Sequence, residues 1–189
     1  MRADLERILL NRDAIARRVE ALAEEITADL AASDHDGQVT LVPVLTGSII
    51  FVADLIRCLP QPMKIHLMSV SSYPGTATTS QGAKIDQTLT KVPTDLTGRY
   101  VLVIDDILDS GNTLRAVVGE LSKRNPFALR TCVLLRKQRP EAMDFPLDYA
   151  AFDIPDEFVV GYGLDYDGYY RNLPDIGVLR PDAIAAPSP

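Results

Sequence analysis

Apolar residues in the first quarter of the chain change from a helical period to a strand period. Between about Asn11 and Ala32 they recur at helical spacing, and Asn11 is a plausible N-cap. Residues 39–45 then form a short, nearly continuous apolar run, which is typical of a parallel strand covered on both faces. The pattern therefore predicts an amphipathic helix followed by a buried strand. The apolar stripe of the helix is Ile15, Val19, Leu22, Ile26 and Leu30.

The same alternation continues along the chain. Thr46-Gly47 breaks the first strand, and a helix is predicted from Ser48 to Cys58, which Pro60 and Pro62 end. Met63 to Ser71 is predicted as the next strand. The remaining predictions are a helix over Thr113–Arg124 and strands at Tyr100–Ile104, Arg130–Leu135, Tyr149–Phe152, Val159–Tyr162 and Ile176–Leu179.

Alternating strands and helices indicate an α/β fold. We expect a Rossmann-like, mainly parallel sheet flanked by helices, with a small hood made of C-terminal strands and the N-terminal helix. The 189 residues fit one domain over 1–189, with a core at about residues 38–180. Residues 185–189 are predicted to be a disordered tail.

Composition narrows the class of protein. The formal charge of −7 argues against a nucleic-acid or membrane-surface binder, since both usually need a basic face. No apolar run approaches the roughly 18 residues that a membrane span needs. Cys58 and Cys132 lie in apolar segments and are predicted to be reduced core thiols, which favours a cytoplasmic location.

Residues 72–82 differ from the rest of the chain. The segment is rich in turn-forming residues and has no apolar period. It is either an exposed loop or a mobile lid, because long loops in compact domains are often functional.

An acid-rich segment follows the strand predicted to begin at Tyr100. Asp105-Asp106 ends this strand, and Asp109–Thr113 opens the next helix. Gly111 lets backbone amides approach an anion closely, and the hydroxyls of Ser110 and Thr113 add donors. The helix that begins here adds free N–H groups and the positive end of its dipole. The segment predicts a cradle for one phosphate group at the carboxyl edge of the sheet.

Three carboxylates beside a phosphate would repel it unless they have another task. Binding neutral hydroxyls, holding a cation and taking a proton are the candidates, and a sugar phosphate satisfies them. The alternative for each acid is a solvated carboxylate at a strand end, with Asp109 capping the helix. A P-loop is excluded, because its glycine spacing and its lysine are missing.

The segment Val101–Thr113 resembles the signature of type I phosphoribosyltransferases: an apolar strand, two acids, two apolar residues and an Asp-Ser-Gly-x-Thr loop. Further segments, in the same order, are similar to hypoxanthine(-guanine) phosphoribosyltransferases within that family. The resemblance covers about residues 40 to 180. These further segments are Val44–Ser48, Ser71–Tyr73, Leu134–Lys137 and Ile154–Tyr166.

The resemblance implies purine salvage: transfer of the 5-phosphoribosyl group from phosphoribosyl diphosphate to N9 of hypoxanthine or guanine, giving IMP or GMP and pyrophosphate. It implies that Asp109 handles a proton near the purine N7 and that Asp109–Thr113 binds the 5′-phosphate. Asp105 and Asp106 would hold the ribose hydroxyls, directly or through a magnesium ion's water shell. Asp165 would be a further metal-associated acid, near the base. Mg²⁺ is the implied cofactor.

On the base side, the resemblance implies that Lys137 donates to the exocyclic oxygen of the purine. Phe158 would stack on the ring, and Val159 would offer backbone contacts to its edge. Ser72 and Tyr73 would form the stem of a lid that excludes water.

On the pyrophosphate side, the resemblance implies that Leu45, Thr46, Gly47 and Arg171 contact the leaving group. The family often carries Lys or Arg where this chain has Thr46, so a formal charge is missing there. A cis peptide at Leu45–Thr46 is expected, because relatives contain a non-proline cis bond in this loop.

Two alternatives stay open. One is a regulator of the same fold that binds RNA or nucleotide without catalysis, although a chain of charge −7 lacks the expected basic patch. The other is a phosphoribosyltransferase for xanthine, adenine or a pyrimidine, against which Lys137 and Phe158-Val159 favour a 6-oxopurine. The partners expected are small-molecule substrates, neither nucleic acid nor membrane, and further copies of the chain in a dimer or tetramer.

Overall fold

A computed structural model describes residues 1–33, 37–71, 84–86 and 90–185. The predicted lid, with Ser72 and Tyr73, lies outside the described residues, and so do residues 186–189 of the predicted tail. Ala185, the first residue of that tail, is the last residue of a short helix, α5 (Pro181–Ala185), so the predicted boundary is wrong by one residue. No helix among the described residues is long and apolar enough to cross a bilayer.

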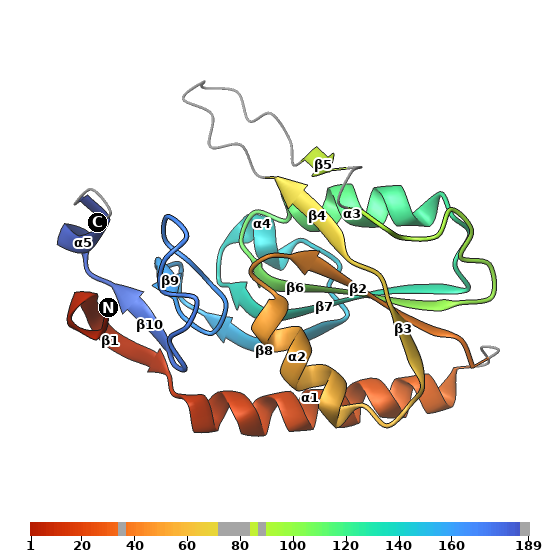
Figure 1. Cartoon of the computed structure of the whole chain (residues 1–189), viewed down its shortest axis with the longest axis horizontal. Helices are drawn as coiled ribbons and strands as arrows, with labels where there is room; N and C mark the ends of the chain where they lie inside the picture. The colour runs from red at the N-terminus through yellow and green to blue at the C-terminus, as the bar shows by residue number, and fades with distance from the viewer. Residues whose placement is uncertain (34–36, 72–83, 87–89, 186–189) are drawn as a thin grey trace.

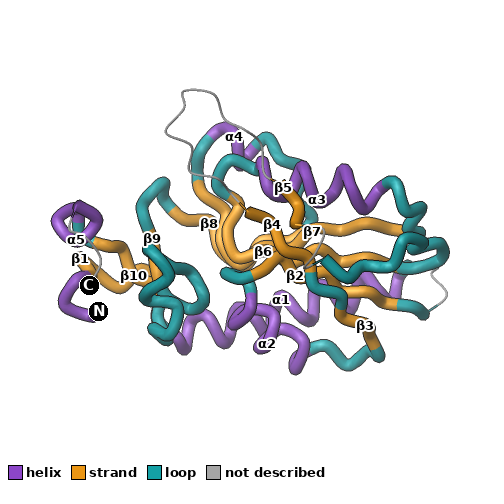
Figure 2. Tube along the Cα trace, turned by 45° about the horizontal axis from the view of Figure 1, so that its top comes forward, coloured by secondary structure: helices purple, strands orange, loops and turns teal. Residues whose placement is uncertain are grey.

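The described residues form a main sheet of seven strands (Figures 1 and 2). Its order is β5-β4-β2-β6-β7-β8, with β3 also paired to β2. Every pairing is parallel except that of β4 with β5. The predicted mainly parallel α/β sheet is therefore confirmed. The strands are β2 Val39–Leu45, β3 Met63–Ile65, β4 Met68–Ser71, β5 Lys84–Asp86, β6 Tyr100–Leu108, β7 Ala128–Lys137 and β8 Tyr149–Ile154.

Helices cover both faces of the main sheet (Figure 1). On one face α1 (Arg12–Ala32) and α2 (Ile49–Cys58) bury their apolar sides in one core cluster with residues of β2, β6 and β7. On the other face α3 (Asn112–Ser122) and α4 (Pro140–Met143) belong to a second cluster. The predicted stripe of α1 is buried, and the Asn11 side chain accepts from Ala14 N at 2.9 Å, as an N-cap should.

A second, three-stranded antiparallel sheet forms the hood, with the strand order β1-β10-β9. Its strands are β1 (Leu5–Leu10), β9 (Val159–Val160) and β10 (Ile176–Leu179). The prediction placed the N-terminal helix in the hood, and this is wrong: α1 packs on the main sheet, and the preceding strand β1 completes the hood instead. The N-terminal 3-10 turn (Arg2–Asp4) and α5 also lie there (Figure 1). Strand β1 was missed because its burial does not alternate.

Several boundaries differ from the prediction in ways that move functional residues. Strand β6 does not end at Ile104 but runs to Leu108, because its parallel pairing with β7 continues through Leu108 and Arg136. Strand β7 likewise runs on to Lys137. Asp105 and Asp106 are therefore strand residues, held in register by backbone pairing, and do not belong to a loop.

Two other segments also differ. The strand predicted over Met63–Ser71 is two strands, β3 and β4, which pair with successive parts of β2 and are separated by His66 and Leu67. The strand predicted over Val159–Tyr162 stops at Val160, because Gly161 turns at a φ of +103°.

The two cysteines have different environments. Cys132 is buried in β7 as predicted, and this burial raises the pKa of its thiol. Cys58 is exposed at the end of α2, so its prediction as a core residue is wrong. Both thiols are free.

Candidate active site

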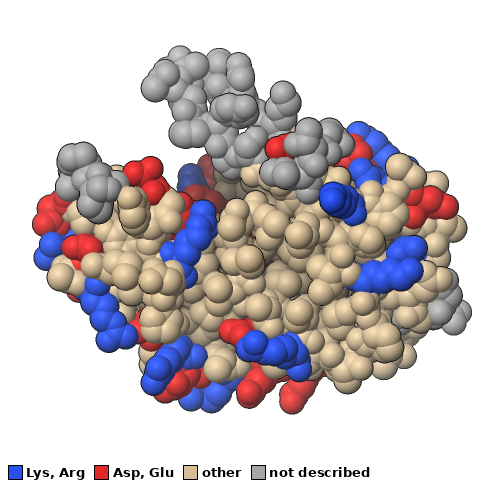
Figure 3. Space-filling model, in the orientation of Figure 1, with Lys and Arg blue, Asp and Glu red and all other residues tan. Residues whose placement is uncertain are grey.

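The carboxyl ends of the parallel strands β2, β6, β7 and β8 meet at one edge of the main sheet, next to the hood. Ligands bind at this edge in open α/β sheets. Figure 3 shows the surface hollowed between the hood and the main sheet, with acidic and basic side chains in the hollow. A pocket of about 310 Å³ lies at the ends of β2 and β6. It is lined by Val44, Leu45, Gly47, Val70 and every residue from Asp105 to Leu114.

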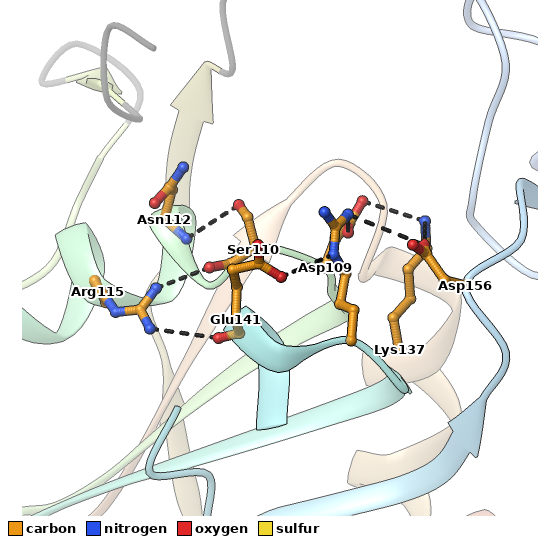
Figure 4. Close-up of polar contacts among 8 residues, drawn as sticks. Asp109, Ser110, Asn112, Arg115, Lys137, Glu141 and Asp156 are labelled. Atoms are coloured by element: carbon orange, nitrogen blue, oxygen red, sulfur yellow. Dashed lines mark hydrogen bonds and ion pairs between the residues drawn. The ribbon is translucent and has the colours of Figure 1, made fainter. Parts of the chain in front are cut away.

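The loop between β6 and α3 is shaped as an anion cradle. Gly111 is the N-cap of α3 and has a φ of +79°, a conformation that only glycine adopts without strain. A Cβ here would also lie 2.6 Å from Arg115 Nη1. That guanidinium donates to Ser110 O at 2.8 Å and to Glu141 O at 3.4 Å, so it ties the loop to α4 (Figure 4). The first turn of α3, residues 112–114, lines the pocket, and the N-terminus of a helix is suited to binding an anion.

Asp105 and Asp106 are neighbouring acids near the end of β6. Asp105 is only 6% exposed, and burial together with the adjacent Asp106 carboxylate raises its pKa well above the ordinary value. Burial also raises the pKa of Asp106. Among the described residues neither acid forms an ion pair; their nearest bonds come from the backbone N–H groups of Asp106 (3.0 Å) and Ile107 (2.9 Å). Among the described residues this is therefore a pair of carboxylates, one buried and one partly buried, without an ion-pair partner; the charge of Arg171 acts to lower the pKa of Asp106 but does not offset the effect of burial.

Gly47 brings the loop after β2 against these acids. A Cβ at Gly47 would lie 1.7 Å from Asp106 Oδ2, so no larger residue fits while Asp106 keeps its position. On its other side Gly47 O approaches Gly163 so closely that a Cβ there would lie 2.2 Å away. The preceding Leu45–Thr46 bond is cis, as predicted, and Thr46 is exposed.

A second group of charged residues, called here the strand-end network, comes from the ends of β6, β7 and β8 (Figure 4). Asp109 follows β6, Lys137 ends β7 and Arg139 follows it, and Asp156 follows β8. Arg139 Nη1 lies 2.6 Å from Asp109 Oδ1, and Lys137 Nζ lies 3.3 Å from Asp109 Oδ2. Lys137 Nζ also lies 3.1 Å from Asp156 Oδ1. Two carboxylates and two cations thus compensate one another.

The hood supplies the predicted base-side residues. Phe158 is 42% exposed, and its ring meets that of Tyr166 edge-on, with centroids 5.5 Å apart. An aromatic ring this exposed is available for stacking. Val159 is buried and pairs with Val178 of β10, which fixes its backbone.

Asp165 and Arg171 form an ion pair with each other. Arg171 Nη2 lies 2.8 Å from Asp165 Oδ1, and Arg171 Nη1 donates to Gly163 O at 2.7 Å. Asp165 Oδ2 accepts from Gly168 N at 2.7 Å. In the described part of the chain no three His, Cys, Asp or Glu side chains gather as a metal site. Asp105, Asp106 and Asp165, predicted as metal-side acids, are therefore not brought together as a three-carboxylate centre.

Sequence reasoning missed four residues at this edge: Arg115, Arg139, Glu141 and Asp156. The signal for Arg139 and Asp156 was present, because they come within two residues of the ends of β7 and β8, the two strands that follow β6 in the sheet. The contacts of Arg115 and Glu141 depend on how α3 and α4 pack, which no sequence pattern indicates.

Comparisons with known proteins agree with this geometry. Residues 7–167 match the model of the phosphoribosyl transferase domain family. A hypoxanthine-guanine phosphoribosyltransferase of Mycobacterium avium is 42% identical over 180 residues, covering 94% of this chain and 87% of the relative. A hypoxanthine-guanine-xanthine phosphoribosyltransferase of Tritrichomonas foetus is 37% identical over 182 residues, covering 95% and 94%.

Solved structures are similar over nearly the whole length. A variant of hypoxanthine phosphoribosyltransferase from Trypanosoma cruzi, in a ternary complex with substrates, superposes with a TM-score of 0.87 at 36% identity. The match covers 97% of this chain and 100% of that one.

Proposed function

The chain belongs to the phosphoribosyl transferase domain family, and we propose that its site transfers the 5-phosphoribosyl group from phosphoribosyl diphosphate to N9 of hypoxanthine or guanine. The products are IMP or GMP and pyrophosphate, and the reaction belongs to purine salvage. The observation that carries this function is the end of β6, where the buried Asp105 and the partly buried Asp106 adjoin an anion cradle in one pocket. The nearby Lys137 and the exposed Phe158 add groups suited to a 6-oxopurine.

In this reaction the bond from C1′ to the pyrophosphate oxygen breaks, and its electron pair leaves with pyrophosphate. The purine N9 forms the new bond to C1′, and the proton that the base loses passes to Asp109. Positive charge develops on the ribose meanwhile, and a carboxylate at this place also stabilises it. Asp109 suits both tasks, because it follows β6 directly and its carboxylate is 45% exposed.

Each part of the sugar phosphate has a counterpart in the pocket. We assign the 5′-phosphate to Asp109–Thr113, where Gly111 and the start of α3 offer backbone donors. The ribose 2′- and 3′-hydroxyls are assigned to Asp105 and Asp106. Hydroxyl donors reduce the cost of burying two carboxylates without a cation.

Magnesium fits the same two acids. They are oxygen ligands, which Mg²⁺ prefers, and burial raises both pKa values, although the charge of Arg171 acts against this at Asp106. With two protein carboxylates at hand, substrate oxygens and water would complete the shell; Asp165 is a third candidate once released from Arg171. Bound there, the ion would neutralise charge on the departing pyrophosphate.

The base is assigned to the hood side of the pocket. Phe158 stacks on the purine, Val159 presents its fixed backbone to the ring edge, and Lys137 donates to the exocyclic oxygen. Stacking tolerates any base, so the preference for a 6-oxopurine rests on Lys137.

The pyrophosphate is assigned to Leu45, Thr46 and Gly47, with Arg171 from the hood. Thr46 brings no charge, and Arg171 is already paired with Asp165. Pyrophosphate therefore depends on backbone donors and on magnesium more than it would with a lysine in this loop.

Three further assignments are proposals of the same kind. We propose that residues 1–189 act as one phosphoribosyltransferase domain, that the chain forms a dimer or tetramer, and that it acts in the cytoplasm. Light scattering coupled to size-exclusion chromatography would measure the oligomeric state, and a monomeric mass at micromolar concentration would contradict the second of these.

A steady-state assay with four bases tests the function. The purified chain is given Mg²⁺, phosphoribosyl diphosphate and hypoxanthine, guanine, xanthine or adenine, and the nucleotides are separated by chromatography. Hypoxanthine or guanine should be turned over fastest. Xanthine is included because the Tritrichomonas relative is named for it. A higher kcat/KM for adenine than for hypoxanthine and guanine would contradict the assignment.

A further inference from the structure

The backbone of Arg139 is fixed at the end of β7. The neighbouring Gln138 N–H donates to Ile154 O at 2.8 Å, and Arg139 O accepts from the N–H groups of Ala142 and Met143. Arg139 is the N-cap of α4 in an extended conformation (φ −132°, ψ 151°), as the following Pro140 requires. Its side chain therefore starts from a defined point beside the site.

The Arg139 guanidinium reaches Asp109 from this point. Its Nη1 lies 2.6 Å from Asp109 Oδ1, and its Nε lies 3.3 Å from Glu141 Oε2, so the guanidinium has a second contact besides Asp109. The hydrogen bond to Asp109 is the main reason that the pKa of Arg139 is raised. A charge-assisted bond of this length is among the stronger side-chain contacts.

Asp109 is oriented by cations more than by burial. Its side chain is 45% exposed, so packing alone does not hold it. Arg139 binds one carboxylate oxygen and Lys137 binds the other. Lys137 also has Asp156 as an alternative partner at 3.1 Å. The two cations therefore favour different carboxylates: Lys137 Nζ lies nearer to Asp156 (3.1 Å) than to Asp109 (3.3 Å), whereas Arg139 Nη1 lies nearer to Asp109 (2.6 Å) than to Asp156 (4.0 Å).

Resting on the function proposed above, we propose that Arg139 is the positioning residue of Asp109. When the base binds, Lys137 turns from Asp109 to the exocyclic oxygen of the purine, and Arg139 keeps Oδ1. The other oxygen, Oδ2, is then free and correctly aimed to take the base proton. In the free chain the ion pairs with Arg139 and Lys137 compensate the negative charge of Asp109.

Loss of Arg139 should impair turnover and binding of the purine base, but it should not weaken the binding of phosphoribosyl diphosphate. Without the guanidinium, Lys137 is the remaining cation on Asp109, so it is held back from the purine, and the carboxylate loses its orientation. The phosphate loop has its own brace, because Arg115 donates to Ser110 O at 2.8 Å and to the main-chain oxygen of Glu141, whereas Arg139 contacts the side chain of Glu141. Phosphoribosyl diphosphate should therefore bind as before.

The test compares Arg139→Gln with Arg136→Gln. Arg136 lies on β7, the strand that Arg139 follows, and its guanidinium forms two bonds to Asp153 (2.6 and 3.0 Å), outside the strand-end network. We expect Arg139→Gln to lower kcat by about 10- to 100-fold, the range of a charge-assisted bond, and to raise KM for hypoxanthine. KM for phosphoribosyl diphosphate should stay within about twofold, and Arg136→Gln should match the wild type. Arg139→Lys, which keeps the charge, should recover part of kcat.

Several outcomes would overturn the inference. One is equal kcat for Arg139→Gln and Arg136→Gln. Another is a rise in KM for phosphoribosyl diphosphate as large as the fall in kcat, which would mean a general disturbance of the loop. If Arg139→Gln does not fold, Arg139→Lys decides. Wild-type kcat and KM values in this variant would mean that the guanidinium, which contacts Asp109 and Glu141 together, is not needed to position Asp109. An inactive wild type would instead refute the proposed function.

Discussion

The two sides of the site compensate their charges in opposite ways. Asp105 is buried in β6 and Asp106 is partly buried; among the described residues neither forms an ion pair, and both have raised pKa values. The strand-end network is more exposed, and each carboxylate there already has a cation. The β6 acids thus have a fixed position but no ion-pair partner among the described residues. The carboxylates of the strand-end network already have cationic partners, and we expect these pairs to change when substrate binds.

This difference separates two kinds of pre-organisation. The backbone register of β6 sets the geometry of the buried acids, and their unmet charge is a driving force for binding a cation or hydroxyl donors. The network stores no such unmet charge. Its specificity comes from which partner each cation keeps, and this makes single substitutions there informative about the chemical step.

The largest expected effect is at Asp109 in the network. Asp109→Asn removes the proton acceptor and the charge but keeps the shape, so kcat should fall by about 10²- to 10⁴-fold. Affinity for phosphoribosyl diphosphate, measured by calorimetric titration, should change little, because Gly111 and α3 still form the cradle. An equal loss of turnover and of affinity would argue against a role in the chemical step.

The next largest effect on activity is expected from a substitution at Gly47 that displaces the carboxylate of Asp106. In Gly47→Ala the added Cβ would lie 1.7 Å from Asp106 Oδ2, so the carboxylate or the loop must move. A shift of about 1 Å at a reacting site costs about 100-fold in kcat/KM. Gly119→Ala is the matched control, because a Cβ on that helical glycine meets nothing within 4 Å. If both variants were equally active, the close contact between Gly47 and Asp106 would not matter for function.

A smaller effect is expected at Lys137. Lys137→Ala removes the donor assigned to the exocyclic oxygen, so the ratio of kcat/KM for hypoxanthine to that for adenine should fall by about tenfold. Lys123→Ala, on the far end of α3, removes an exposed lysine paired with Glu120 and should leave this ratio unchanged. Undiminished discrimination against adenine in Lys137→Ala would refute the assignment.

The smallest effect concerns stability and pH. Because the pKa of Asp105 is raised on folding, its contribution to stability is present below the unfolded pKa of about 4 and is lost as pH rises toward the folded value. The metal-free chain should therefore become less stable above about pH 4 through this group. Asp105→Asn should raise the free energy of unfolding at pH 7 by about 1–3 kcal/mol, because it removes a buried carboxylate that forms no ion pair among the described residues.

Denaturant unfolding at several pH values, without metal, measures this effect. The exposed Asp144→Asn serves as the control and should keep the wild-type pH dependence. A less stable Asp105→Asn at pH 7 would mean that Asp105 is satisfied in the free chain, contrary to the comparison above.

The sequence predicted the sheet side of the molecule better than the network. Apolar periodicity located β2, β6, β7 and their helices, and the order Asp-Asp-x-x-Asp-Ser-Gly indicated the pocket. It did not locate the hood strand β1, whose burial lacks alternation and whose partner β10 lies at the other end of the chain. Arg139 was missed for a related reason: its role depends on which strand end lies beside β6.

The predicted roles of Asp165 and Arg171 show a second limit of prediction from the sequence, which does not indicate which charged side chains pair. Each was assigned singly, from its place in a motif, and the structure pairs them with each other. Charge compensation between two side chains depends on the turn at Gly168, which a local pattern does not report.

The most direct measurement is the stoichiometry of one reaction. The chain is incubated with Mg²⁺, hypoxanthine and a limiting amount of phosphoribosyl diphosphate, and IMP and pyrophosphate are both counted, with a parallel sample in excess EDTA. We expect equal amounts of IMP and pyrophosphate, and none of either with EDTA. Pyrophosphate released without IMP, or no product at all, would contradict it.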